Sequence, residues 1–179
     1  MKSKLKKSVI LSLVLACFFS GEVFARDISK YNEAQNTYVD SEQLPSTEKE
    51  AYDIDGGAER STAMATAISS IRDGGKGVIK VWAETNMFKP VDWACLTVYL
   101  EQWDEESNSW QIVEEYEKEF LPEDEEDGEL TSVSVDLSYS NQPLGYYYRV
   151  RALHELEFDN GWYEIRVTKT DGILMEYVP

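Results

Sequence analysis

Between residue 61 and the C-terminus, apolar and polar side chains alternate in short runs that are separated by turn residues. The run at residues 130–138 is the clearest, because Val133, Val135 and Leu137 alternate with serine and aspartate. Successive side chains on a β-strand point to opposite faces, so this pattern predicts a strand with one buried face. Comparable runs lie at residues 77–83, 92–103, 110–120, 146–153, 162–170 and 173–179.

Residues 61–71, STAMATAISSI, have the alanine content of a helix, but their serines and threonines and the strand-rich surroundings favour a strand. Seven or eight short strands in about 120 residues, rich in Val, Tyr, Trp and Thr, are typical of one all-β domain. We expect residues 61–179 to form an antiparallel β-sandwich of the immunoglobulin or fibronectin type.

The stretch GYYYRVRALH, residues 145–154, divides into two faces when it is placed on a strand. The set that suits the core is Tyr146, Tyr148, Val150 and Ala152, and the set that suits a solvated face is Tyr147, Arg149, Arg151 and Leu153. In immunoglobulin-type sandwiches a tyrosine near the start of a late strand bonds back to the backbone. Tyr146 or Tyr148 would take that role, and the two arginines would pair with Glu164 or nearby carboxylates.

Residues 1–25 have the features of an export signal. A basic start with four lysines precedes an apolar run from Val9 to Phe19, and Ala25 supplies the small residue required before a cleavage point. We expect cleavage after Ala25 and secretion. Two alternatives stay open: an uncleaved membrane anchor, and a lipoprotein in which Cys17 carries the lipid.

Residues 26–60 are polar and acidic and show no lasting hydrophobic period, which predicts a disordered spacer. The whole chain has a formal net charge of −17, and loss of residues 1–25 would leave 13 basic and 33 acidic residues, a net charge of −20. Such a charge argues against binding nucleic acid or anionic membrane surfaces. It favours solubility and cations or basic partners, and we expect no stable membrane insertion after cleavage. The candidate partners are a basic protein or a carbohydrate at the cell surface.

Cys95 is the single cysteine that remains after cleavage, so a disulfide within the chain and a cysteine-based zinc site are both excluded. It lies in an apolar run, and we expect a small buried hydrophobic residue. A reactive free thiol or an intermolecular bridge is the alternative.

Motifs for catalysis or cofactor binding are missing from the sequence. His154 is the single histidine, and the chain has no Gly-x-Ser-x-Gly motif, phosphate-binding loop or dinucleotide fingerprint. Pairs of carboxylates could serve a glycosidase, but with 34 acidic residues their presence discriminates nothing. We expect a protein that is not an enzyme and that binds no cofactor.

Residues 101–129 hold 14 acidic residues and one lysine, Lys118. The EF-hand pattern fails, because with Gly128 at its sixth position the twelfth is Ser134 rather than glutamate. Like charges in a block repel each other, so we expect a solvated loop. Weak calcium binding through Asp124, Glu126 and Asp127 is the alternative.

Aromatic residues offer the remaining candidate site. If Leu96, Val98 and Leu100 face the core, the opposite face of the same strand carries aromatic rings next to carboxylates. Rings that stack on sugars, beside acids that bond their hydroxyls, are typical of sugar-binding sandwiches. The candidate ligand face is Trp93, Tyr99, Trp103 and the hairpin partner Trp110, unless other parts of the chain cover it.

GYYYRVRALH, followed by NGWYE and TKTDGI, resembles a family of small exported proteins of Gram-positive bacteria that is classed as a domain of unknown function. SSIRDGGKGVIKV and the LTVYLEQW…SW hairpin are similar to its middle section, and the resemblance covers most of residues 61–176. It implies an exported all-β domain without known activity and supplies no catalytic residues. We therefore expect a non-enzymatic binding or interaction module at the cell surface. The alternatives are a structural surface protein without a discrete ligand and an unrecognised hydrolase.

Overall fold

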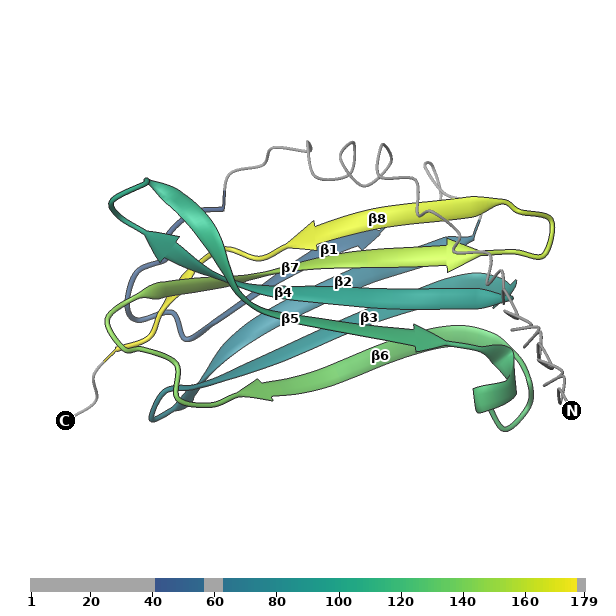
Figure 1. Cartoon of the computed structure of the whole chain (residues 1–179), viewed down its shortest axis with the longest axis horizontal. Coiled ribbons are helices and arrows are strands. Elements are labelled where there is room, and N and C mark those ends of the chain that lie inside the picture. The colour runs from purple at the N-terminus through teal and green to yellow at the C-terminus, as the bar shows by residue number, and fades with distance from the viewer. Residues whose placement is uncertain (1–40, 57–62, 177–179) are drawn as a thin grey trace, which may run out of the picture.

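The computed structural model describes residues 41–56 and 63–176, which form two antiparallel β-sheets packed face to face (Figure 1). One sheet has the strand order β1-β2-β3-β6, and the other has the order β5-β4-β7-β8, with β9 paired to β7. The strands are β1 (Glu50–Gly56), β2 (Met64–Gly75), β3 (Val78–Val91), β4 (Trp93–Asp104), β5 (Ser109–Phe120), β6 (Leu130–Tyr139), β7 (Tyr147–Glu157), β8 (Tyr163–Lys169) and β9 (Ile173–Leu174).

This architecture confirms the all-β sandwich that alternation predicted. The only helical element in the described ranges is one 3₁₀ turn, η1 (Pro122–Asp124). These ranges contain no helix that is long and apolar enough to cross a membrane. The order β2-β3-β6 opposite β5-β4-β7-β8 corresponds to A-B-E opposite C′-C-F-G of immunoglobulin-like domains, with β1 added outside the first strand.

The tyrosine expected at the corner before the late strand is Tyr148, on β7. Its hydroxyl donates to the carbonyl oxygen of Pro143, 3.0 Å away, and accepts a hydrogen bond from Gln102 at 3.1 Å. The ring is fully buried, and burial raises the pKa of the hydroxyl to about 12. Tyr148 therefore anchors the turn before β7 to the core.

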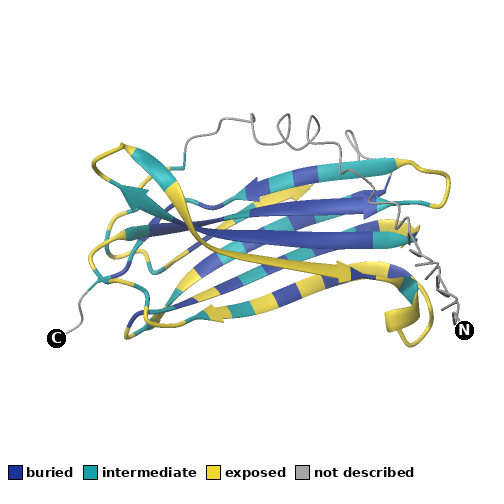
Figure 2. Ribbon diagram, in the orientation of Figure 1, coloured by how far each residue is buried: buried dark blue, intermediate teal, exposed yellow. Residues whose placement is uncertain are grey.

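The core lies between the two sheets and is filled by the inward positions that the sequence pattern gave. Figure 2 shows buried positions alternating with exposed ones along β3 and β6. Leu96, Val98 and Leu100 of β4 are completely buried in this core, and Val133 and Val135 of β6 pack into it. The period-2 pattern thus identifies the inward residues of β4 and β6.

Three positions of the 146–153 prediction are wrong. Tyr146 lies just before β7 and is 48% exposed, because its carbonyl pairs with Met175 while its side chain leaves the core. Arg149 and Leu153 share the outer face as expected, but they are 8% and 1% exposed rather than solvated. Arg149 is buried because a carboxylate neutralises it and an aromatic ring packs against it.

The structure also differs from the predicted spacer at residues 26–60, because it places β1 within it. β1 pairs with β2 along its whole length, and Ala51 is the one buried residue of the strand. A strand that buries a single small side chain leaves little hydrophobic signal. Residues 1–40, with the expected export signal and Cys17, lie outside the described ranges.

Candidate functional site

The sequence-predicted aromatic residues lie on the outer face of the β5-β4-β7-β8 sheet. Trp93, Tyr99 and Trp103 project from β4, and Trp110 projects from β5 opposite Trp103. Trp93 is six residues from Tyr99, about 20 Å along an extended strand. The structure thus brings together three of the four rings and leaves Trp93 at the far end.

Internal contacts occupy these three rings. Trp103 and Trp110 pack edge to face, with ring centroids 5.3 Å apart. The guanidinium of Arg149 lies 4.6 Å from the centroid of Trp110, and that of Arg151 lies 4.4 Å from the centroid of Tyr99, which is only 5% exposed. A sugar stacks on the open face of a ring, and here arginines take up two of those faces.

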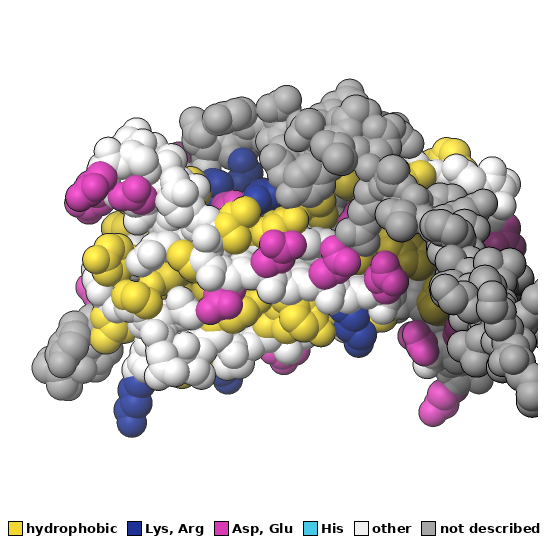
Figure 3. Space-filling view, viewed as in Figure 1, with side chains coloured by type: hydrophobic (Ala, Val, Ile, Leu, Met, Phe, Trp, Pro, Cys, Tyr) yellow, Lys and Arg dark blue, Asp and Glu magenta, His cyan; other side chains and the backbone are white. Residues whose placement is uncertain are grey.

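Glu101 holds the two arginines in place from the neighbouring strand. Its carboxylate accepts from Nε of Arg149 at 2.6 Å and from Nε of Arg151 at 2.8 Å. Its side chain is 4% exposed, so this is a buried ion-pair cluster. The expected partner, Glu164, instead lies 3.4 Å from Nε of Arg166 on its own strand. One carboxylate thus bridges two guanidiniums on the outer face of this sheet. Figure 3 views the molecule from the side of this sheet, where acidic side chains lie among hydrophobic ones.

His154 lies in the core between the sheets and has no access to solvent. Its Nδ1 is 2.7 Å from the hydroxyl of Thr85, and its Nε2 is 2.9 Å from the hydroxyl of Thr168. Desolvation, helped by nearby Arg166, lowers its pKa to about 3, so the ring is neutral at physiological pH. A buried neutral imidazole held by two hydroxyls is a structural element of the core.

The acidic segment, residues 101–129, is not one loop: it spans the end of β4 with the buried Glu101, the turn to β5, β5 itself and the loop that follows. Nearly all of β5 is exposed, and Asp124, Glu126 and Asp127 project from the loop, where Asp127 accepts from the backbone NH of Glu129. Across residues 41–56 and 63–176, no three carboxylate, histidine or cysteine groups lie close enough together to hold a metal ion. Cys95 is buried, as its apolar surroundings indicated.

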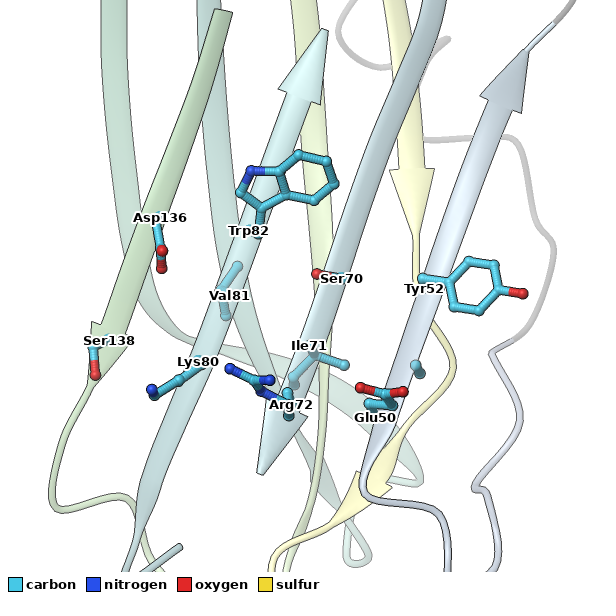
Figure 4. A pocket seen from close by; sticks show the side chains of 11 residues that line it. Glu50, Tyr52, Ser70, Ile71, Arg72, Lys80, Val81, Trp82, Asp136 and Ser138 are labelled. Carbon is cyan, nitrogen blue, oxygen red and sulfur yellow. The ribbon is translucent and has the colours of Figure 1, made fainter. Parts of the chain in front are cut away.

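An open groove of about 490 Å³ lies on the opposite side of the molecule, on the outer face of the β1-β2-β3-β6 sheet (Figure 4). We call it the Trp82 groove. Strand pairing arranges its side chains in two rows across the four strands. One row is Tyr52, Ser70, Trp82 and Asp136, and the neighbouring row is Glu50, Arg72, Lys80 and Ser138.

In the first row, the large ring of Trp82 lies next to the small side chain of Ser70. The indole of Trp82 lies over the gap between β3 and β2, next to the small side chain of Ser70, while Tyr52 forms the outer rim at β1 (Figure 4). Tyr52 is 72% exposed, and no described residue makes a ring or cation contact with Trp82. Trp82 is thus a half-buried ring with an open side above Ser70.

The second row supplies polar groups. The guanidinium of Arg72 lies between β2 and β3, Lys80 points toward β6, and the carboxylate of Glu50 lies on the β1 side (Figure 4). These side chains are exposed, as are Asp136 and Ser138. The groove therefore combines one ring face with hydroxyls, two cations and two carboxylates, which are the groups that bind hydroxyl-rich molecules.

The sequence held a signal for this groove that the pattern analysis missed. In VIKVWAET, residues 78–85, the alternation that buries Ile79 and Val81 turns Lys80 and Trp82 outward. A tryptophan at a strand position that alternates with the buried ones indicates a ring on the outer face. The β1 side could not be found this way, because β1 itself was not predicted.

In comparisons with known proteins, no family model, no curated protein and no solved structure matches this chain. Function must therefore be argued from the site.

Proposed function

We propose that this protein is a non-enzymatic, exported binding module that holds a saccharide chain in the Trp82 groove. The observation that carries this proposal is the open indole face of Trp82 beside Ser70, in a row of hydrogen-bonding side chains. Stacking of a pyranose ring on an indole buries apolar C–H groups, and neighbouring polar groups bind the hydroxyls.

Competing classes of function have less support. The only histidine is buried and neutral, which argues against histidine-based hydrolysis. The net charge of −17 argues against nucleic acid. The aromatic face around Trp103 and Trp110 is taken up by Arg149 and by the contact between the two rings. In the Trp82 groove, by contrast, no other described residue makes a ring or cation contact with the indole of Trp82.

Affinity electrophoresis of the purified protein in gels that contain soluble polysaccharides tests the proposal. The panel is neutral glucan, xylan and mannan with polygalacturonate and alginate. We expect at least one polysaccharide to retard the wild type, and Trp82→Ala to abolish that retardation. Trp103→Ala is the matched control on the other sheet and should keep it.

Two results would overturn this proposal. If no polysaccharide retards the wild type, the module does not bind saccharide chains. If Trp103→Ala loses binding while Trp82→Ala keeps it, the ligand lies on the β5-β4-β7-β8 face instead.

A further inference from the structure

The second row of the Trp82 groove places two cations directly opposite each other. Arg72 of β2 and Lys80 of β3 are register partners, so their Cα atoms are about 5 Å apart. Like charges directly opposite on neighbouring strands destabilise a sheet. Glu50 of β1 lies opposite Arg72 on its other side, whereas the residue opposite Lys80 on its other side is the uncharged Ser138. Within residues 41–56 and 63–176, no carboxylate forms an ion pair with either side chain.

The two cations stand out against the charge of the whole chain. The protein has 34 acidic and 17 basic residues, yet the middle of this row presents two positive side chains to solvent. The carboxylates of the groove lie at its margins: Glu50 on β1, and Asp136 on β6 (Figure 4). Positive charge is thus central and negative charge peripheral.

We propose that the groove selects saccharides that carry a carboxylate, namely chains of uronic acid, and this inference rests on the proposed function above. The pyranose ring lies against Trp82 above Ser70, and its carboxylate lies between Arg72 and Lys80. A guanidinium binds a carboxylate through two parallel hydrogen bonds, and the ammonium adds a point charge. The sugar hydroxyls donate to Asp136 and Glu50.

The marginal carboxylates set the limit of this selectivity. A densely sulfated chain would place anionic groups beside Glu50 and Asp136 as well as between the cations, and the net charge of −17 would repel it further. One carboxylate per sugar, surrounded by hydroxyls, matches the groove better than a chain with several sulfates per sugar.

Calorimetric titration with matched ligands tests this inference. The probes are tetrasaccharides of galacturonic and mannuronic acid, each compared with its own methyl ester, which keeps the sugar but removes the charge. We expect the wild type to bind at least one acid about tenfold more tightly than its ester, and added NaCl to reduce the difference. In the double variant Arg72→Gln with Lys80→Gln, this ratio should fall to about one or two.

The control variant is Lys89→Gln with Lys118→Gln, which changes the net charge equally but leaves the groove intact, and it should keep the preference for the acid. A heparin tetrasaccharide should bind more weakly than the uronic acids. If acid and ester bind equally to the wild type, or if only neutral saccharides bind, the inference fails while the proposed function stands. If the acid preference survives in the double variant, the carboxylate site is elsewhere and the inference is wrong. If none of these tetrasaccharides binds while a neutral polysaccharide retards the protein in the gel, the inference alone fails, and if neither experiment detects binding, both proposals fail.

Discussion

Single residues in this sandwich show how burial decides what an ionisable group can do. His154 is completely buried and held by Thr85 and Thr168, and its pKa falls from 6.5 to about 3 because burial disfavours the charged ring. Between about pH 3 and pH 6.5, the imidazole of His154 is therefore protonated in the unfolded chain but neutral in the folded chain. The neutral ring contributes stability that is complete above about pH 6.5 and is lost as the pH falls toward 3.

We predict that His154 makes the free energy of unfolding fall by about 2–3 kcal/mol between pH 7 and pH 4.5. Urea unfolding of the wild type and of His154→Leu at both pH values measures it. The variant should be less stable at pH 7, since two hydroxyls lose a partner, but it should lack this part of the pH dependence. Identical pH dependence in both proteins would contradict the assignment.

Glu101 is buried as well, but its carboxylate is paired with two cations, Arg149 and Arg151. Glu101→Gln keeps the shape but leaves the arginines without their shared counter-charge. We predict a loss of about 3 kcal/mol in unfolding free energy, the usual cost of breaking a buried pair from one side. Chemical denaturation measures it, and the exposed Glu105→Gln is the control that should change little. Equal stability of the two variants would show that the cluster is not a structural element.

At the scale of elements, the turn between β2 and β3 depends on backbone conformations that favour glycine. Gly75 and Gly77 have φ values of 80° and 73°, in the left-handed region. A Cβ on Gly75 would meet nothing within 4 Å, whereas one on Gly77 would approach the carbonyl oxygen of Gln142 to 2.9 Å. Alanine at Gly75 would therefore add backbone strain alone, whereas alanine at Gly77 would add steric overlap to that strain.

We predict that Gly75→Ala costs about 1 kcal/mol through strain alone, and that Gly77→Ala costs roughly 1–3 kcal/mol more because the segment at Gln142 must shift. Thermal unfolding of both variants provides the comparison. A Gly77→Ala protein as stable as Gly75→Ala would mean that the contact between the two turns is not required.

Strands with a clear alternation could be predicted from the sequence, while those without one could not. β4 and β6 were predicted with the correct inward residues, because large aliphatic side chains recur at every second position. β1 was missed, since it buries only Ala51 and gains its stability from pairing with β2. Backbone pairing between distant segments leaves little trace in local sequence.

The sequence suggested the kind of site that we propose, a sugar-binding aromatic surface, but it did not indicate which face of the sandwich carries it. Exposed tryptophan and tyrosine suggested sugar binding, yet the chosen rings contact Arg149 and Arg151. Those contacts depend on how β4, β5 and β7 lie next to each other, which alternation does not specify. The groove needs β1, β2, β3 and β6 in one sheet, and the tertiary structure was required to place Tyr52, Ser70 and Trp82 in one row.

At the scale of the whole molecule, the charge of −17 acts on stability and on the choice of partners. The acidic residues of β5 and the loop 121–129 lie mostly exposed, where salt screens their repulsion. We predict that raising NaCl from about 20 to about 300 mM increases the melting temperature by a few degrees. Calcium at equal ionic strength should add nothing, as scanning calorimetry can show. A calcium-specific rise that disappears when Asp124, Glu126 and Asp127 are neutralised would establish a cation site there.

Backbone amide NMR during a saccharide titration will show whether the ligand binds on the outer face of the β1-β2-β3-β6 sheet. The probe is the polysaccharide fragment that retards the protein most, or tetragalacturonate if none does. We predict saturable shifts that cluster at Tyr52, Ser70, Trp82 and their strand neighbours, with those of Trp103 and Trp110 unchanged. Shifts confined to the Trp103 and Trp110 face, or no saturable shifts at millimolar saccharide, would contradict the account.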